Sequence, residues 1–189
     1  MWTLLDTIGS SIVGASIMLL VFALILQMNT ISGQIESNNL IQSHYTATME
    51  VLNYDLHKIG YQADGEKILF ADAESIKYCT DLGNDGSVDT VSYSVATTSD
   101  STGNTIYLYR QVNDEIKKNI GVLSDFSISY FDSIGNTINY SDLGAASFRY
   151  KIRSIEIKLE MTVDEGDDTG FKDLNWRVRI KPKNLLSRK

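Results

Sequence analysis

The sequence has almost none of the residues that cross-link or kink a polypeptide. Only one of its 189 residues is proline, and only one, Cys79, is cysteine. A disulfide within the chain is therefore excluded, and the fold must depend on its hydrophobic core. A single proline is typical of a chain dominated by one long helix and by β-sheet. We expect Cys79 to be a buried, unreactive thiol, because its neighbours alternate as in a strand.

Positive charge is also scarce. The chain carries 24 acidic and 17 basic residues, giving a formal charge of −7, and its first Lys or Arg is Lys58. This balance argues against a nucleic-acid partner, since phosphates are bound by basic patches. It also leaves no basic strip near the N-terminus for anionic lipid headgroups.

Residues 7–35 contain no charged side chain, and residues 8–28 form an apolar run. A helix that crosses a bilayer needs about 20 mostly apolar residues, so this run predicts a membrane span. A secretory signal peptide is the alternative, but it requires a basic start, a shorter apolar core and a small-residue cleavage site, which are lacking. The positive-inside rule gives no orientation, because neither end of the span carries Lys or Arg.

Helical spacing continues beyond the span. Apolar residues recur every three or four positions and predict one face that packs on a sheet. These residues are Ile41, Tyr45, Met49, Leu52, Leu56 and Ile59. Gly60 supplies a helix stop. We therefore expect one helix over 4–59, about 80 Å long at 1.5 Å per residue.

Beyond Gly60 the apolar period changes to two, which is typical of strands with one buried face. The expected strands are 75–80, 88–95, 105–110, 126–131, 137–140, 152–163 and 176–181. Turn residues separate them, and no gap is long enough for a second crossover helix, although a short helix fits 140–146. The predicted fold class is α+β: a long N-terminal helix whose first half spans a membrane and whose second half packs on an antiparallel sheet.

This pattern divides the chain into three parts. Residues 1–29 form the transmembrane half of the helix, residues 30–60 its amphipathic half, and residues 61–189 the antiparallel β domain. Residues 30–189 would then form a single globular head, because the amphipathic stripe has no other apolar partner.

Several segments, in this order, resemble one known family. The start Trp2-Thr3-Leu4-Leu5-Asp6 is similar to the Phe-Thr-Leu-Ile-Glu start of type IV pilins and pseudopilins. The β domain most resembles the larger minor subunits, the J-type pseudopilins of type II secretion and the W-type minor pilins. The matching segments are 51–61, 81–93, 108–110, 122–135 and 152–159.

The resemblance implies a structural subunit, not an enzyme, that assembles through its N-terminal helix with other pilin-like subunits. It implies assembly roles for Trp2 and Asp6, with the Asp6 carboxylate pairing with the N-terminal ammonium of a neighbouring subunit. The chain would lie in the inner membrane before assembly, with its C-terminal domain extracytoplasmic, in the periplasm or at the cell surface. The alternative for Asp6 is a solvated interfacial carboxylate that favours the helix N-terminus.

The start also departs from the family pattern. The acid is Asp instead of Glu and stands at position six, and no proline interrupts the membrane helix. Either a leader precedes the present sequence, or Met1 is the first mature residue.

An acidic, glycine-containing loop is the candidate metal site. Asp81, Asp85 and Asp89 could supply oxygen ligands to Ca²⁺, which binds six to eight of them. An EF-hand loop would require different residues where Gly83 and Ser92 stand. The favoured alternative is a hairpin turn in which the acids bind backbone amides.

No catalytic motif is present, and His44 and His57 are too far apart on the helix to share a metal. We therefore expect no catalytic residue, no small-molecule substrate and no cofactor other than Ca²⁺. The second functional hypothesis is a single-span, membrane-tethered, extracytoplasmic binding domain, with calcium as its candidate ligand, that does not polymerise.

Overall fold

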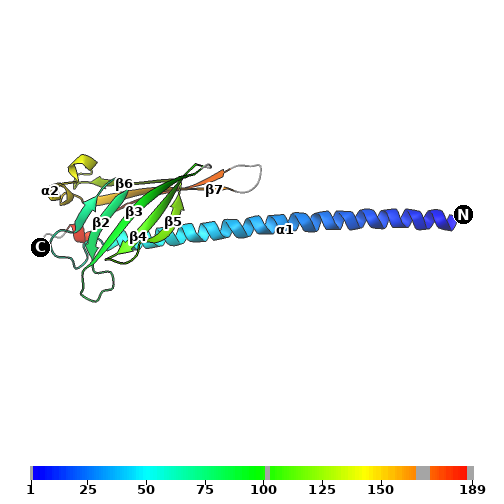
Figure 1. Ribbon diagram of the computed structural model, residues 1–189, viewed down its shortest axis with the longest axis horizontal. Coiled ribbons are helices and arrows are strands. Elements are labelled where there is room, and N and C mark those ends of the chain that lie inside the picture. The colour runs from blue at the N-terminus through cyan, green and yellow to red at the C-terminus, as the bar shows by residue number, and fades with distance from the viewer. Residues whose placement is uncertain (1, 101–102, 165–170, 187–189) are drawn as a thin grey trace.

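The computed structural model describes residues 2–100, 103–164 and 171–186 and shows the expected α+β fold. One helix, α1 (Trp2–His57), is followed by a head built from two antiparallel sheets. Figure 1 shows α1 projecting far beyond the head, with the N-terminus at its free end and the C-terminus at the opposite end of the molecule.

The larger sheet is a five-stranded meander in chain order, and the smaller sheet has the order β6-β7-β8. The larger sheet consists of β1 (Ile68–Ala71), β2 (Ser75–Thr80), β3 (Asp89–Asp100), β4 (Gly103–Val112) and β5 (Lys118–Leu123). The smaller sheet consists of β6 (Asp125–Phe131), β7 (Ser154–Asp164) and β8 (Phe171–Ile180). Backbone bonds from Ser124 to Glu160 and from Ile128 to Ala73 join the two sheets.

Three expectations about the strands were wrong. Residues 137–140 do not form a strand, because only Thr137 pairs, in an isolated bridge to Phe131. The chain then enters two short helices, η1 (Tyr140–Asp142) and α2 (Ala146–Arg149). Strands β1 and β5 were not predicted from the sequence. β1 is a run of four apolar residues and β5 contains a glycine, so neither shows a clear alternation of apolar and polar residues.

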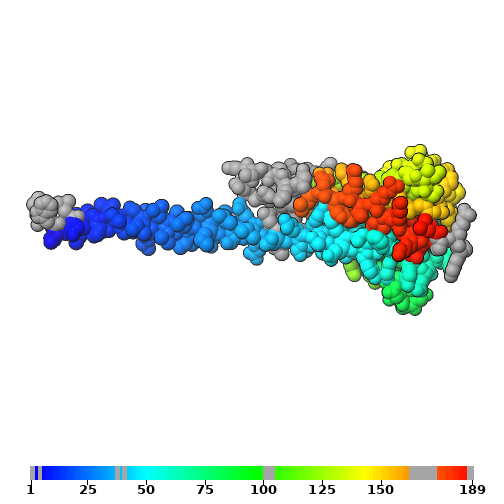
Figure 2. Space-filling view, turned by 180° about the vertical axis from the view of Figure 1, so that it is seen from behind, coloured from blue at the N-terminus to red at the C-terminus, as the bar shows by residue number. Residues whose placement is uncertain are grey.

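The end of α1 is part of the core of the head. Leu52, Leu56 and Ile59 are fully buried in one cluster with side chains from both sheets. The helix ends where expected, with Gly60 at a φ of +74°, a left-handed conformation that terminates helices. From Ile8 to Ile31 the large apolar side chains of α1 remain exposed, as Figure 2 shows for the bare shaft of the helix.

Candidate functional site

The N-terminal part of α1 is the first candidate site. Residues 6–36 form a helix long and apolar enough to cross a membrane, with a mean hydropathy of 2.4 in its most apolar window, and none of that window is buried. Several hydroxyls in it donate to backbone carbonyls one turn earlier, among them Ser10 to Thr7 and Ser16 to Ile12. These bonds satisfy polar groups within the helix, as a water-free environment requires.

Asp6 is exposed at the start of this span. Within the described part of the chain no basic residue pairs with it, and α1 contains no Lys or Arg. Any cation that neutralises Asp6 in an apolar environment must therefore come from the chain terminus or from another molecule. Trp2 is the first residue of α1, and its side chain lies outside the described set.

The predicted packing stripe contacts the sheets through its C-terminal members. Tyr45 and Met49 are partly buried against the core, and the side chain of Ile41 lies outside the described set. Thr48 lies between them, with its hydroxyl donating to the backbone oxygen of Ile120 in β5. The helix therefore joins the head at about Tyr45, and the preceding part of α1 extends away from it.

A buried ion pair fixes α1 to the larger sheet. Arg110 of β4 donates through Nε to Oδ2 of Asp55 at 2.7 Å, and the Tyr93 hydroxyl of β3 donates to the same oxygen at 2.6 Å. The Asp55 side chain is 2% exposed and that of Arg110 is 20% exposed. Burial of a carboxylate is costly unless it is paired and hydrogen-bonded, and both conditions are met here.

This network shifts the pKa values of Tyr93 and Arg110. Burial raises the pKa of the Tyr93 phenol, and the adjacent Asp55 carboxylate raises it further. Burial alone would lower the pKa of Arg110, but its hydrogen bond to Asp55 and the charge of that carboxylate raise it overall. Tyr78, also fully buried beside these groups, has a hydroxyl without a hydrogen-bond partner among the described residues. Tyr78, Tyr93 and Arg110, whose pKa values are all raised, keep their protons near neutral pH, which suits a structural role.

The predicted metal loop is closed by its own hydrogen bonds. Buried Asp81 accepts from the amides of Asp85 and Gly86, and Asp89 accepts from the amide of Leu82. The Lys58 ammonium enters the same loop and donates to the Leu82 carbonyl at 2.7 Å. Within the described ranges no three His, Cys, Asp or Glu residues are grouped as metal ligands. The geometry is that of an Asp-stabilised turn in which Lys58 supplies the cation.

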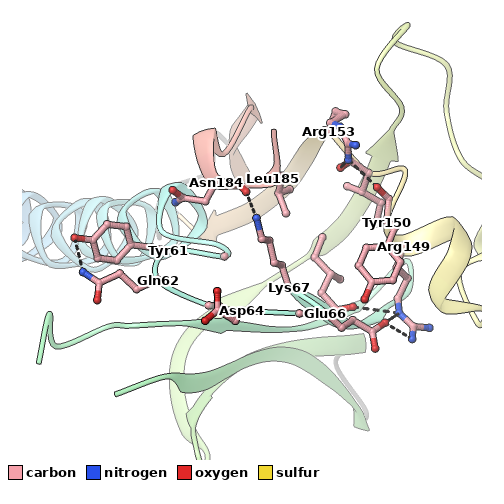
Figure 3. A pocket seen from close by; sticks show the side chains of 15 residues that line it. Tyr61, Gln62, Asp64, Glu66, Lys67, Arg149, Tyr150, Arg153, Asn184 and Leu185 are labelled. Carbon is pink, nitrogen blue, oxygen red and sulfur yellow. Dashed lines mark hydrogen bonds and ion pairs between the residues drawn. The ribbon is translucent and has the colours of Figure 1, made fainter. Parts of the chain in front are cut away.

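A cavity of about 960 Å³ opens at the end of the head where α1 stops. Its walls come from the segment after Gly60, from the residues around Arg149 and Arg153, and from the C-terminal turn η2 (Lys183–Leu185). Figure 3 shows Arg149 directed at Glu66, and Lys67 directed at the backbone of Asn184. The Arg149–Glu66 distance is 2.6 Å.

Cys79 is half-buried instead of fully buried, because it faces away from its buried neighbours Tyr78 and Thr80. Burial raises the pKa of its thiol, which keeps it protonated and weakly nucleophilic.

Sequence reasoning did not assign a role to Asp55, Tyr93 or Arg110. The signal in the sequence was the acidic Asp55, which lies between Leu52 and Leu56 of the predicted packing stripe. A carboxylate at a buried position requires a cation or hydrogen-bond donors as partners. Compared with known proteins, the chain matches no family model, no curated protein and no solved structure.

Proposed function

We propose that this protein is a structural, minor subunit of a pilin-like or pseudopilin filament of the type II secretion or type IV pilus class. It assembles with other pilin-like subunits through α1. The observation that carries the proposal is the division of one continuous 56-residue helix into an exposed apolar shaft and a buried end.

The exposed shaft needs an apolar environment. Its large apolar side chains, from Ile8 to Ile31, each expose about half or more of their surface. Burial of apolar surface is worth about 25 cal/mol per Å², so such a surface is strongly driven out of water. Lipid covers it while the subunit lies in the inner membrane, and the shafts of neighbouring subunits cover it in the filament.

The polar part of α1 that follows Met28 also favours packing between helices. Between residues 7 and 49 the sequence has a single formally charged side chain, Glu36, although the segment after Met28 is no longer apolar. Helices that face water usually carry many charges on their polar face. Asn, Gln, Ser and Thr side chains instead suit contacts between helices, where they form hydrogen bonds.

The second candidate is a membrane-tethered binding domain that does not polymerise. The cavity at the end of the head favours it, since this opening lies beyond the C-terminal end of α1, at the opposite end of the molecule from the apolar span of residues 6–36. In both proposals the head is extracytoplasmic.

Cross-linking between shafts separates the two proposals. Cysteines replace Ser10 and Ser16 together in a Cys79→Ser background, and native membranes are oxidised. When cysteines are also placed at the aligned positions of the neighbouring pilin-like subunits, a filament subunit forms covalent multimers larger than dimers, because each chain then offers two thiols to different neighbours. A tether gives monomers, a result that would remove the filament proposal. The matched control is the Cys79→Ser chain without new cysteines.

A further inference from the structure

An aspartate followed directly by a glycine occurs twice in the chain, at Asp64-Gly65 and at Asp85-Gly86. In this dipeptide the amide nitrogen of the glycine can attack the side-chain carboxyl carbon of the aspartate, because glycine has no side chain that hinders a close approach. The attack rearranges the backbone, so such a dipeptide is stable only where the fold holds the two reacting groups apart. The structure holds the two dipeptides in different ways.

Hydrogen bonds hold both reacting groups of the Asp85-Gly86 dipeptide. The amide of Gly86 donates to Oδ2 of Asp81 at 2.9 Å, and Oδ1 of Asp85 accepts from the amide of Ser87 at 2.8 Å. Asp81 is fully buried, so its carboxylate is a fixed acceptor. A reaction here would break both bonds and would leave a buried carboxylate with one donor fewer, which is costly.

The Asp64-Gly65 dipeptide lies in the loop between α1 and β1 and lacks such bonds. Both residues are exposed, and within the described part of the chain neither the Asp64 carboxylate nor the Gly65 amide has a hydrogen-bond partner. Figure 3 shows the Asp64 side chain unbonded in the cavity wall, whereas the neighbouring Glu66 is bonded to Arg149. The attacking nitrogen and the carboxyl group are therefore free to meet, and the cavity admits water to them.

We propose that Asp64, which the fold leaves free, is a site of spontaneous isomerisation to isoaspartate. The Gly65 nitrogen forms a bond to Cγ of the protonated Asp64 carboxyl group, and its proton leaves with the carboxyl hydroxyl as water. Water then opens the resulting five-membered succinimide at either of its carbonyls, which gives aspartate or isoaspartate. Atoms and electrons balance with water alone, so the reaction needs no enzyme, metal or oxidant.

The product changes the connection between the helix and the head. In isoaspartate the main chain runs through the side-chain carboxyl carbon, so it gains one atom, and the free carboxylate moves to the α carbon. Ala63 is buried before the site, and Glu66 is anchored to Arg149 after it, so the cavity wall must take up the extra length. The modification accumulates with the age of the molecule and is independent of filament assembly.

Ageing of the full-length chain in detergent micelles at neutral pH and 37 °C tests this. Samples taken over several weeks are digested with trypsin, and mass spectrometry with electron-transfer fragmentation measures isoaspartate in the peptides of residues 59–67 and 78–110. We expect Asp64 to isomerise at least fivefold faster than Asp85 in the folded chain, and the two rates to agree within twofold in guanidinium chloride. Equal rates in the folded chain would overturn the proposal. A fivefold difference that persists in the denatured chain would show that local sequence, and not the fold, selects Asp64, and would refute it as well.

Gly65→Ala is the matched variant. Its methyl group hinders the attacking nitrogen and meets nothing else, because no atom lies within 4 Å of the Cβ position at Gly65. We expect it to slow isomerisation at Asp64 at least fivefold and to leave the rate at Asp85 unchanged. Circular dichroism identifies a misfolded variant, and Gly65→Asn, which tolerates a positive φ, then replaces it. An unchanged rate at Asp64 in a folded variant would exclude attack by the Gly65 nitrogen.

Discussion

Arg110 contacts Asp55 at 2.7 Å, which ties the last turns of the long helix to the fourth strand of the larger sheet. The same carboxylate accepts from Tyr93, so two neighbouring strands bind one side chain of α1. The helix shaft and the head are joined into one body by this contact and by the apolar side chains around it.

We expect removal of one partner of this pair to destabilise the head strongly. Arg110→Ala leaves a buried carboxylate without its cation, and such losses cost about 3–5 kcal/mol. Thermal unfolding of the full chain in detergent, followed by near-UV circular dichroism, measures the effect. The double variant Asp55→Leu, Arg110→Met should recover much of the loss, because it removes the buried charge as well.

The exposed pair between Lys158 and Asp125 is the matched control. Both side chains are partly exposed, and Lys158→Ala should cost much less than Arg110→Ala, because solvent-exposed ion pairs contribute little to stability. If Arg110→Ala costs no more than Lys158→Ala, the buried pair is not what holds α1 to the sheet.

Sequence periodicity predicted α1, the antiparallel sheets and the position of the helix stop at Gly60. It succeeded there because long regular patterns reflect burial on one face of an element. It missed β1, which is short, and it assigned a strand to 137–140 where the backbone pairs only once. Local alternation cannot tell whether a neighbouring strand is available to complete the pairing.

The polar side-chain contacts of the head could not be predicted from the sequence in the same way. Asp55 and Arg110 lie in two separate segments, 51–61 and 108–110, at positions 55 residues apart, and only the fold brings them together. Lys58 directly follows the last residue of α1, yet its ammonium enters the turn around Leu82. Residue spacing within a segment says nothing about which distant loop a long side chain reaches.

Alkaline pH should destabilise the head through its buried tyrosines. Burial raises the pKa of Tyr78, Tyr93 and Tyr130 above the ordinary value of 10.0. Above pH 10 the unfolded chain loses these protons and the folded chain keeps them, so stability is complete below pH 10 and falls as pH rises. Each tyrosine contributes a loss of about 1.4 kcal/mol per pH unit.

Urea unfolding at pH 9, 10, 11 and 12 measures this dependence. Tyr93→Phe should reduce the slope above pH 10 by about a third, because phenylalanine does not titrate. A free energy of unfolding that stays constant from pH 10 to 12 would contradict the role of the buried phenols.

Alanine substitutions at the two glycines that follow α1, Gly60 and Gly65, should destabilise the head to different extents. Gly60 has a φ of +74°, and a Cβ there would lie 2.7 Å from Cδ of Lys67. Gly65 has a φ of +86° with no atom near its Cβ position. Gly65→Ala should cost about 1 kcal/mol from backbone strain, and Gly60→Ala should cost more because Lys67 must also move. Equal melting temperatures for the two variants would show that Lys67 yields without penalty.

The loop around Asp81 tests the calcium hypothesis directly. Its carboxylates already bind backbone amides and Lys58 lies among its oxygens, so we expect millimolar Ca²⁺ to leave the melting temperature unchanged. Lys58→Met should lower it, since the loop then loses its cation. A rise of several degrees with Ca²⁺, reversed by chelator, would instead establish a metal site, because a ligand of the native state stabilises it by mass action.

The last prediction concerns Asp6. In a filament the shafts are buried against one another, so an unpaired carboxylate in that apolar interior would be costly, whereas a paired one would fix the position of each subunit along its neighbour. Asp6→Ala should abolish multimers in the Ser10 and Ser16 cysteine cross-linking experiment. Asp6→Glu, which keeps the charge, should retain them in part. Membrane insertion and the thermal unfolding of the head should be unchanged in both variants, because Asp6 lies at the far end of α1 from the core. If Asp6→Ala cross-links as the parent does, pairing of this carboxylate does not drive assembly.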